Sequence, residues 1–321
     1  QERADDGSLL EARPREDVAG MVIGKWRFLR FVMAAGLLLL CLPSIAAATT
    51  LYVPANYPTI QSAINAATNG DDITISAGTY VENLDLLGKS IVLAGSGEVI
   101  IDGNQQGPTI IAGDNAGTGG WQTFYGLKIT GGLNKGDSLS GHGYGGGIRL
   151  SDTSFVLIQY CDIYGNEALF GGGIGGDYTM SNTYHKVMMK NTAVHENTAN
   201  RGGGIGGDFH GLCTLDSSIW QNTGGGVDAE QVQHDSVIHF ARTLIANNDG
   251  GGLHFYSSNV PTYNRALVTN CLITGNRGVA VGSGTANLQL VHCTIAYNNS
   301  TSDAGAIHNF AGENYIYNTI F

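Results

Sequence analysis

The chain has 321 residues, of which 48 are Gly, 42% are hydrophobic and 13% are charged, and its formal net charge is −11. The Gly excess follows no strict three-residue period, which excludes a collagen helix, and the apolar share is large enough to exclude wholesale disorder. An acidic chain lacks the basic footprint that nucleic-acid binding requires, so we expect no nucleic-acid partner.

The first 48 residues differ from the rest. Residues 1–20 show no hydrophobic periodicity, and we expect them to be a leader outside the mature protein. Residues 21–48 combine basic residues, a short apolar run and a final Ala-Ala-Ala, the pattern of a secretory signal peptide cleaved after Ala48. The apolar run is too short for a comfortable membrane span. We therefore expect a protein exported to the medium or the cell surface, with residues 49–321 as its folded domain.

The start of this domain predicts a short helix followed by strands. Residues 58–67 place Ile60, Ala63 and Ile64 on one face of an amphipathic helix, which we expect to cap the core. Strands are expected at residues 72–76, 83–86, 90–94 and 98–102. The chain stops within a repeat, so we expect the domain to be incomplete at its C-terminus.

A repeat then recurs about every 26 residues between Ile148 and Ile307. One six-residue unit has Cys, Ser or Thr first, Ile or Val third and Asn sixth, and a Gly-rich block follows it. The sixth-position residues are Asn166, Asn197, Asn222, Asn248, Asn276 and Asn298. Each repeat holds two or three short runs of alternating polarity, which is too little for a propeller blade. The pattern predicts an all-β fold, a single-stranded right-handed parallel β-helix with one repeat per rung.

The Asn positions predict a ladder. Stacked rungs would bring equivalent side chains into a file along the solenoid, where amides can share hydrogen bonds. Asn also tolerates the left-handed conformation of a sharp corner, so we expect these residues to form the corners.

Two stretches carry a family resemblance. The segment Leu51–Ala67, with Gly70-Asp-Asp-Ile-Thr-Ile and Ala77-Gly-Thr-Tyr-Val-Glu-Asn, resembles the opening of right-handed parallel β-helix proteins of the pectate-lyase-like superfamily. The later Ile-x-x-Asn and Gly-Gly-x-Ile units resemble repeats of bacterial polymorphic outer-membrane proteins. The resemblance covers about residues 50–321. It implies this fold and export, but not an activity, because the fold hosts lyases, hydrolases, esterases and inert adhesins.

The strands after the Gly blocks carry the candidate site. Alternation along these strands directs their second and fourth residues outward. The candidates for a ligand groove are Arg149, Asp228 and His254 in one column, and Asp177, Asp208, Glu230 and Tyr256 in the next.

The acidic column needs compensation, because like charges on neighbouring rungs repel each other. Asp177, Asp208 and Glu230 together are a candidate Ca²⁺ site, since Ca²⁺ favours several carboxylate oxygens. A raised carboxyl pKa in a catalytic cluster would also relieve the repulsion. A third reading is that the side chains spread into water and bind nothing.

The sequence leaves two functions open. The polygalacturonase motifs are incomplete and the pectin methylesterase motifs are absent, which favours a non-catalytic protein that is adhesin-like or binds a polysaccharide or cell-surface glycan. We expect this protein to be a monomer. The alternative is a Ca²⁺-dependent polysaccharide lyase or glycoside hydrolase that acts on an acidic glycan such as pectin or alginate.

Cys271 and Cys293 share a column, and either a disulfide or two thiols would fit there.

Overall fold

The computed structural model describes residues 48–113, 115–118, 120–136, 143–177, 185–231, 237–257, 265–284, 287–300, 305–309 and 313–321. The predicted leader and signal peptide, apart from Ala48, therefore lie outside the described residues. Within the described part of the chain, no helix has the length and apolar character needed to cross a membrane.

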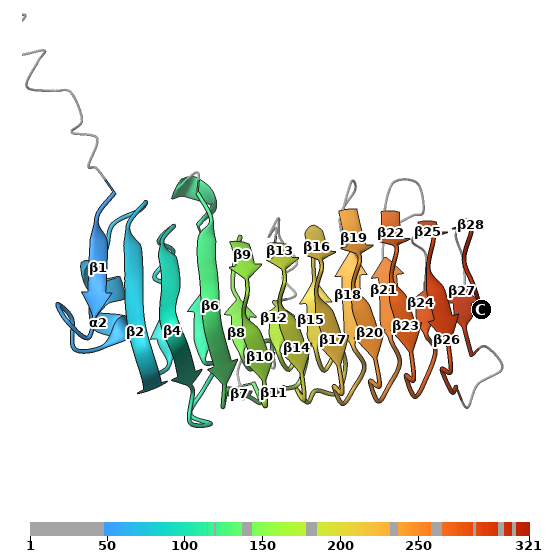
Figure 1. The fold of residues 1–321 in the computed structure, drawn as a ribbon, viewed down its shortest axis with the longest axis horizontal. Helices are drawn as coiled ribbons and strands as arrows, with labels where there is room; N and C mark the ends of the chain where they lie inside the picture. Colours follow the sequence, from blue (N-terminus) through green and yellow to red (C-terminus); the bar gives the residue numbers. More distant parts are fainter. Residues whose placement is uncertain are drawn as a thin grey trace, which may run out of the picture. The chain divides into compact units, whose positions relative to one another are not determined.

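The unit from Ala48 to Phe321 is a stack of parallel strands (Figure 1). Its strands form a 17-stranded sheet, which supplies two faces of the stack, and a nine-stranded sheet, which supplies the third. In the repeats each strand pairs in parallel with its equivalents in the rungs before and after, as in β15 (Ile205–Asp208) between β12 (Ile174–Gly176) and β18 (Val227–Gln231). The prediction of stacked parallel rungs is confirmed.

The strands fall into files by face. The first face holds β1 (Thr50–Val53), β2 (Asp72–Val81), β4 (Val92–Asp102), β6 (Gln122–Thr130), β9 (Phe155–Gln159), β13 (Lys186–Lys190), β16 (Gly211–Leu215), β19 (Val237–Ala241), β22 (Arg265–Thr269), β25 (Asn287–Val291) and β28 (Asn314–Tyr317). The second face holds β10 (Asp162–Tyr164), β14 (Ala193–His195), β17 (Ser218–Trp220), β20 (Leu244–Ala246), β23 (Leu272–Thr274) and β26 (Thr294–Ala296). The third face holds β3 (Leu84–Asp85), β5 (Ile110–Ala112), β8 (Ile148–Leu150), β12, β15, β18, β21 (Leu253–Ser257), β24 (Val281–Ser283) and β27 (Ile307–Asn309). A short pair, β7 (Leu133–Asn134) and β11 (Glu167–Ala168), and a 3-10 helix, η1 (Ala116–Thr118), lie outside these files.

The early strands are longer than predicted. β4 joins the two strands expected at residues 90–94 and 98–102, and its register against β6 shifts between Ala94 and Val99. β6 likewise pairs with β9 at its start and with β10 at its end. One bent strand therefore serves two faces in these rungs, because a register shift absorbs the corner that later rungs make with a turn.

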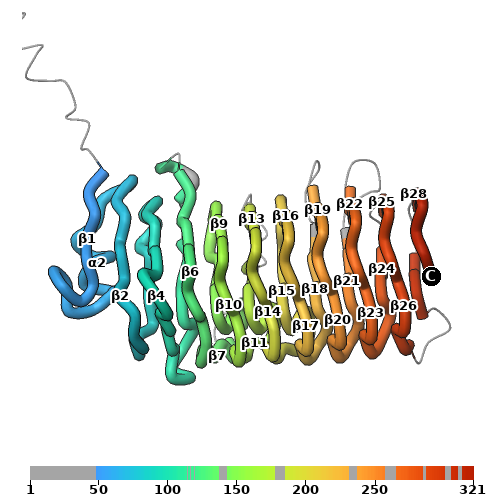
Figure 2. The backbone as a smooth tube through the Cα atoms, viewed as in Figure 1, coloured from blue at the N-terminus to red at the C-terminus, as the bar shows by residue number. Residues whose placement is uncertain are grey.

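The later rungs make sharp corners (Figure 2). Residues in the left-handed conformation stand at these corners. A positive φ precedes the strand of the second face at Tyr160, Asn191, Asp216, Arg242, Asn270 and His292, and follows it at Gly165, Glu196, Gln221, Asn247, Gly275 and Tyr297. Each of the latter residues comes directly before a ladder Asn, and no ladder Asn has a positive φ itself. The expectation that the ladder Asn residues adopt the left-handed conformation is wrong.

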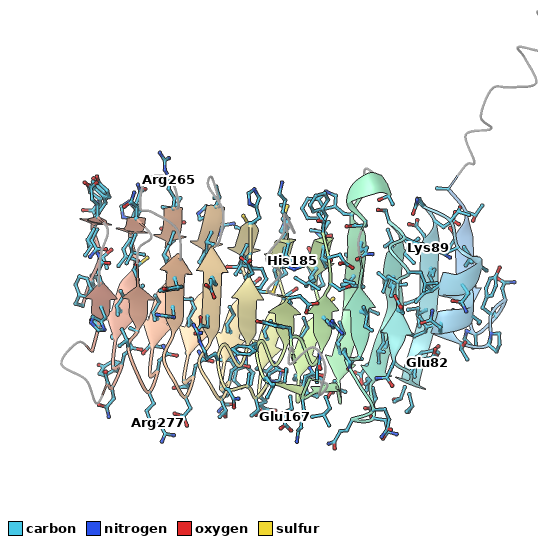
Figure 3. The ribbon with its side chains drawn as sticks, turned by 180° about the vertical axis from the view of Figure 1, so that it is seen from behind. Glu82, Lys89, Glu167, His185, Arg265 and Arg277 are labelled. Carbon is cyan, nitrogen blue, oxygen red and sulfur yellow. The ribbon has the colours of Figure 1, made fainter. Side chains whose placement is uncertain are left out.

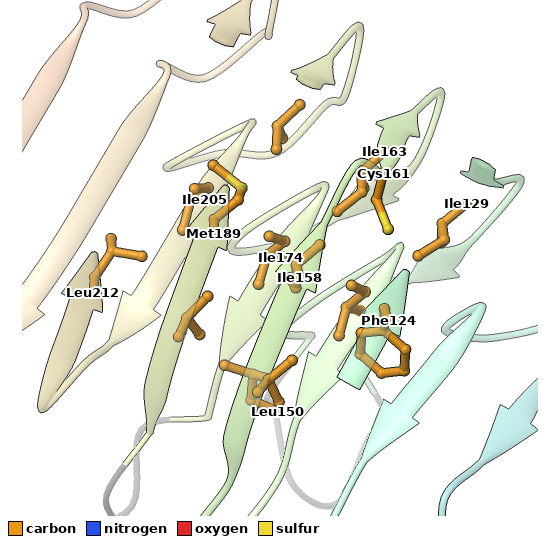
Figure 4. Packing of buried hydrophobic residues seen from close by; sticks show 14 of the residues in the cluster. Phe124, Ile129, Leu150, Ile158, Cys161, Ile163, Ile174, Met189, Ile205 and Leu212 are labelled. Atoms are coloured by element: carbon orange, nitrogen blue, oxygen red, sulfur yellow. The ribbon is translucent and has the colours of Figure 1, made fainter. Parts of the chain in front are cut away.

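The core lies between the three faces (Figure 4). Ile158 on the first face, Ile163 on the second and Leu150 on the third are fully buried, and their neighbours in the same files repeat the pattern. Alternation along each strand sends these side chains inward. Because every rung adds equivalent apolar side chains, the core continues from rung to rung.

The six ladder Asn residues form the predicted file of hydrogen bonds. The backbone N and Nδ2 of Asn197 both donate to Oδ1 of Asn222, at 3.1 and 3.2 Å, and Nδ2 also donates to the Ile163 carbonyl at 2.9 Å. The bonds from each ladder Asn to the next repeat without interruption from Asn166 to Asn298. All members before Asn298 are at most 1% exposed. The ladder thus satisfies buried amides that would be costly without partners.

The first position of the repeat forms a second file of donors. The Cys161 Sγ, Thr192 Oγ1 and Ser217 Oγ each donate to the carbonyl two residues earlier, and the later repeats do the same. This need for a small donor explains why the position holds only Cys, Ser or Thr. Cys271 and Cys293 are neighbours in this file and are both free thiols.

Helix α2 (Ile60–Ala66) packs against β1, β2 and β3. Ile60, Ala63 and Ile64 are buried in the core, as the amphipathic pattern predicts. Glu82 accepts hydrogen bonds from the Ile60 and Gln61 backbone N–H groups, both at 3.0 Å, and Lys89 donates to the Ile64 carbonyl at 2.7 Å (Figure 3). Opposite charges therefore satisfy the two ends of the helix. Its role as a cap for the core stays a prediction.

The ladder predicts a graded loss of stability. Asn222→Ala should lower the free energy of unfolding by about 3 kcal/mol, because the buried Asn197 N–H groups and the Val194 carbonyl lose their partner. Asn298→Ala, at the half-buried end of the ladder, should cost about 1 kcal/mol. Urea denaturation of the two variants measures this difference. Equal losses would contradict a continuous ladder.

Candidate functional site

Glycine turns fold over the outer side of the third face. A Cβ at Gly175 in β12 would lie 2.0 Å from the backbone N of Gly145, and one at Gly206 in β15 would lie 2.6 Å from that of Gly171. No side chain fits at such distances, so these two strands need Gly at their second position. The close approach brings the residues before the turns onto the outer surface of the third face.

These residues form a file of their own. Tyr144 pairs with Phe170, and Phe170 pairs with Arg201, each through an isolated parallel bridge. The Tyr144 and Phe170 rings stack with centroids 4.9 Å apart and an interplanar angle of 22°. The file therefore presents an aromatic wall that ends in a guanidinium group.

The wall borders a pocket of about 230 Å³ on the third face. We call this pocket the Tyr144 pocket, and its lining residues are Tyr144, Phe170, Arg201, Gly207, Asp208, Asp228 and Glu230. Asp208 and Glu230 are register partners on β15 and β18, so two carboxyl groups of neighbouring rungs share the pocket. The pocket combines an apolar side with an acidic side, as sites for small polar ligands often do.

Arg201 neutralises one carboxylate in the pocket. Its Nε and Nη2 donate to the two carboxylate oxygens of Asp228, at 2.9 and 3.0 Å, and His254 Nδ1 lies 3.5 Å from Asp228 Oδ1. Burial raises the pKa of Asp228, but the hydrogen bonds and charges of His254 and Arg201 lower it by more. The net pKa of Asp228 therefore lies below its ordinary value. Asp228 is therefore ionised and fixed in position at neutral pH.

Glu230 and Tyr144 have the opposite electrostatic environment. Burial raises the pKa of the half-buried Glu230, and the charge of Asp228 adds to this although Arg201 opposes it. Burial, together with the charges of Asp177, Glu230 and Asp208, raises the pKa of Tyr144 to about 12. The Tyr144 hydroxyl is therefore neutral at physiological pH and lies within the field of all three predicted carboxylates.

Asp177 has its own partner. Arg149 Nη2 donates to Asp177 Oδ2 at 3.0 Å, and the two residues lie on neighbouring rungs. Asp177 and Asp208 are only 8% and 9% exposed, so these two side chains do not lie on a solvated face. The Gly-rich turns and neighbouring rungs cover them.

The remaining predicted residues lie where the register places them. Asp228 pairs with His254, and Glu230 pairs with Tyr256, which is 41% exposed. His254 is near the pocket through its contact with Asp228, whereas Tyr256 does not line the Tyr144 pocket. The structure thus brings Asp208, Asp228 and Glu230 into one pocket and leaves Arg149 with Asp177.

Sequence reasoning missed Tyr144, Phe170, Arg201 and His185. The first three share a clear signal, since each directly precedes a Gly triplet. His185 is 1% exposed, and its Nε2 lies 3.2 Å from the Asp177 carbonyl. Burial lowers its pKa, which keeps the ring neutral at physiological pH. No sequence motif marks this position.

The structure does not support the expected Ca²⁺ site. In the described part of the chain, no three His, Cys, Asp or Glu side chains gather so that they could hold a metal ion. Asp177 pairs with Arg149, and Arg201 lies close enough to Glu230 to affect its pKa. Arg149 therefore supplies a counter-charge for one member of the acidic column, Asp177, whereas the pKa of Glu230 stays raised.

Comparisons with known proteins agree with the fold. The model of the right-handed beta helix region matches residues 147–295. The structure of pectate lyase Pel9A superposes with a TM-score of 0.51 at 15% identity, covering 86% of this chain and 79% of that chain. The pectin methylesterase from Aspergillus niger (11% identity, 87% and 86% coverage) and the Escherichia coli protein YbhC (10%, 87% and 86%) each give a TM-score of 0.39.

A search among curated proteins finds no match. The chain is therefore a right-handed parallel β-helix with a pectate-lyase-like fold. At this level of identity the likeness shows the fold alone, so the function has to be argued from the pocket.

The geometry of the acidic column predicts indifference to Ca²⁺. Millimolar CaCl₂ should leave the melting temperature of the protein unchanged, because Asp177 is already paired with Arg149 and the described carboxyl groups form no cluster of three ligands. Differential scanning fluorimetry with CaCl₂, and with MgCl₂ as the control, measures this. A Ca²⁺-specific rise in melting temperature that Asp208→Asn removes would restore the calcium site.

Proposed function

We propose that this protein is an exported, adhesin-like β-helix that binds a glycan in the Tyr144 pocket without catalysis. The observation that carries the proposal is the stacked Tyr144 and Phe170 wall beside the Asp208, Asp228 and Glu230 carboxyl groups. Export, which residues 21–48 predict, placement at the cell surface and a monomeric state belong to the same proposal.

The pocket has the complementary chemistry for a sugar. Sugar rings offer C–H groups that pack on apolar aromatic surfaces, and their hydroxyl groups donate to carboxylates. Tyr144 and Phe170 supply the first kind of contact, and Asp208 and Glu230 supply the second. The strands that carry the carboxyl groups are held in a rigid sheet, so little ordering is required on binding.

The charge of the pocket favours a neutral glycan over an acidic one. Asp208, Asp228 and Glu230 face one guanidinium group, Arg201, and the whole chain has a net charge of −11. A polyuronate would meet repulsion from this surface. This argues against the alternative, a Ca²⁺-dependent lyase or hydrolase of pectin or alginate.

A glycan array followed by calorimetry tests the proposal. The wild-type protein should bind neutral glycans, and Tyr144→Ala and Asp208→Asn should each weaken binding by about tenfold or more, because each removes one side of the pocket. Glu98→Gln, which changes an exposed acid paired with Lys128, is the matched control and should bind normally.

Two results would overturn the proposal. Absence of binding to every glycan would reject the pocket as a glycan site. Unsaturated product from polygalacturonate or alginate, lost in Asp208→Asn, would show the lyase instead.

A further inference from the structure

A second pocket lies beside the Tyr144 pocket. It has a volume of about 280 Å³, and glycines of two turns, Gly224–Gly225 and Gly250–Gly252, contribute much of its lining. We call it the glycine pocket. His254 and His308 line it, and Asp228 lines both this pocket and the Tyr144 pocket.

One side chain is missing from an outward file beside the glycine pocket. The second positions of β18, β21, β24 and β27 are in register and hold Asp228, His254, Gly282 and His308. Gly282 lines the pocket without a side chain, and the His254 ring lies over it, with Cδ2 2.7 Å from the place of a Cβ. The φ of Gly282 is not in the left-handed region, so the backbone there would accept another residue.

We propose that the two pockets form one groove along the solenoid, which takes a linear oligosaccharide rather than a single sugar. This proposal rests on the glycan-binding function proposed above. Each pocket alone is smaller than the roughly 300–1,000 Å³ of ordinary ligand sites, and the two together fall within that range. The shared Asp228 joins them.

The length of the groove fits a chain of several sugars. Its lining residues on the strands of the third face extend from Asp208 on β15 to His308 on β27, which are four rung steps apart. Strands in a sheet lie about 4.8 Å apart, so the groove is about 19 Å long. Its direction is fixed by the register of the rungs, so a bound chain lies parallel to the solenoid axis.

Asp228 is suited to serve both halves. Arg201 holds it from the side of the Tyr144 pocket and His254 from the side of the glycine pocket. The two halves offer different contacts, because the first has aromatic rings and carboxyl groups, whereas the second is lined mainly by glycines and imidazole groups. A polymer gains affinity by occupying both, since the second contact is intramolecular.

Chain length is the test. Neutral β-1,4-linked gluco- and manno-oligosaccharides, from disaccharide to hexasaccharide, are titrated into the wild-type protein by calorimetry. We expect the affinity to rise at least tenfold with length and then to level off once the groove is filled.

Gly282→Leu is the decisive variant, because it adds a large side chain to a residue that lines the glycine pocket. The three atoms nearest to the new Cβ all belong to the His254 ring, with Cδ2 at 2.7 Å, and that ring lies at the end of a side chain that can rotate. In this variant, the affinity should no longer rise with the length of the oligosaccharide. His254→Ala with His308→Ala, which adds no bulk, should reduce the gain, and Thr274→Leu on the second face is the control with the wild-type profile.

The outcomes separate this proposal from the proposed function. Binding that is the same for all lengths, or a gain that survives in Gly282→Leu, would overturn the extended groove and leave the Tyr144 pocket as the glycan site. No binding of any length would overturn the proposed function, and the groove with it.

Discussion

The in-register pairing of equivalent rungs is the constraint on which the structure depends. Each ladder Asn from Asn166 to Asn276 donates its backbone N–H and its Nδ2 to the Oδ1 of the next, and these donors are at most 1% exposed. A shift of one residue would leave these amides without partners and would send core side chains to the outer surface. The ladder therefore fixes the register of the neighbouring faces, and every column of side chains follows from it.

The pockets are a consequence of the same register. Gly175 and Gly206 leave room for the turns that carry Tyr144, Phe170 and Arg201, and Gly282 lines the second pocket further along the third face. The columns of the third face that hold side chains place carboxyl groups on neighbouring rungs. Arg149 pairs with Asp177, and Arg201 pairs with Asp228, each across two neighbouring rungs. A solenoid of this kind varies its surface by changing single members of a column, while the ladder and the core stay constant.

The sequence predicted most of the fold and part of the site. The spacing of Asn166 to Asn298 predicted the ladder, and the Gly blocks predicted the register of the third face, because both repeat at equivalent positions. The left-handed residues before the ladder Asn positions could not be predicted from residue type, since Glu196, Gln221 and Tyr297 adopt this conformation only because the rung closes there. The bent strands β4 and β6 lie before the regular repeats and have no periodic signal.

The aromatic wall was missed although its signal was present. Tyr144, Phe170 and Arg201 each precede a Gly triplet, but only a close approach of backbones reveals that they reach the third face. The predicted carboxyl groups were placed in the right columns, but the ion pair of Asp228 with Arg201 depends on a side chain from a turn.

Hydrogen exchange of the Asn side-chain amides tests the central claim most directly. The account predicts that the Nδ2 protons of Asn197, Asn222 and Asn248 exchange orders of magnitude more slowly than those of the exposed Asn65. Exchange of the ladder amides at the rate of Asn65 would contradict the stacked register.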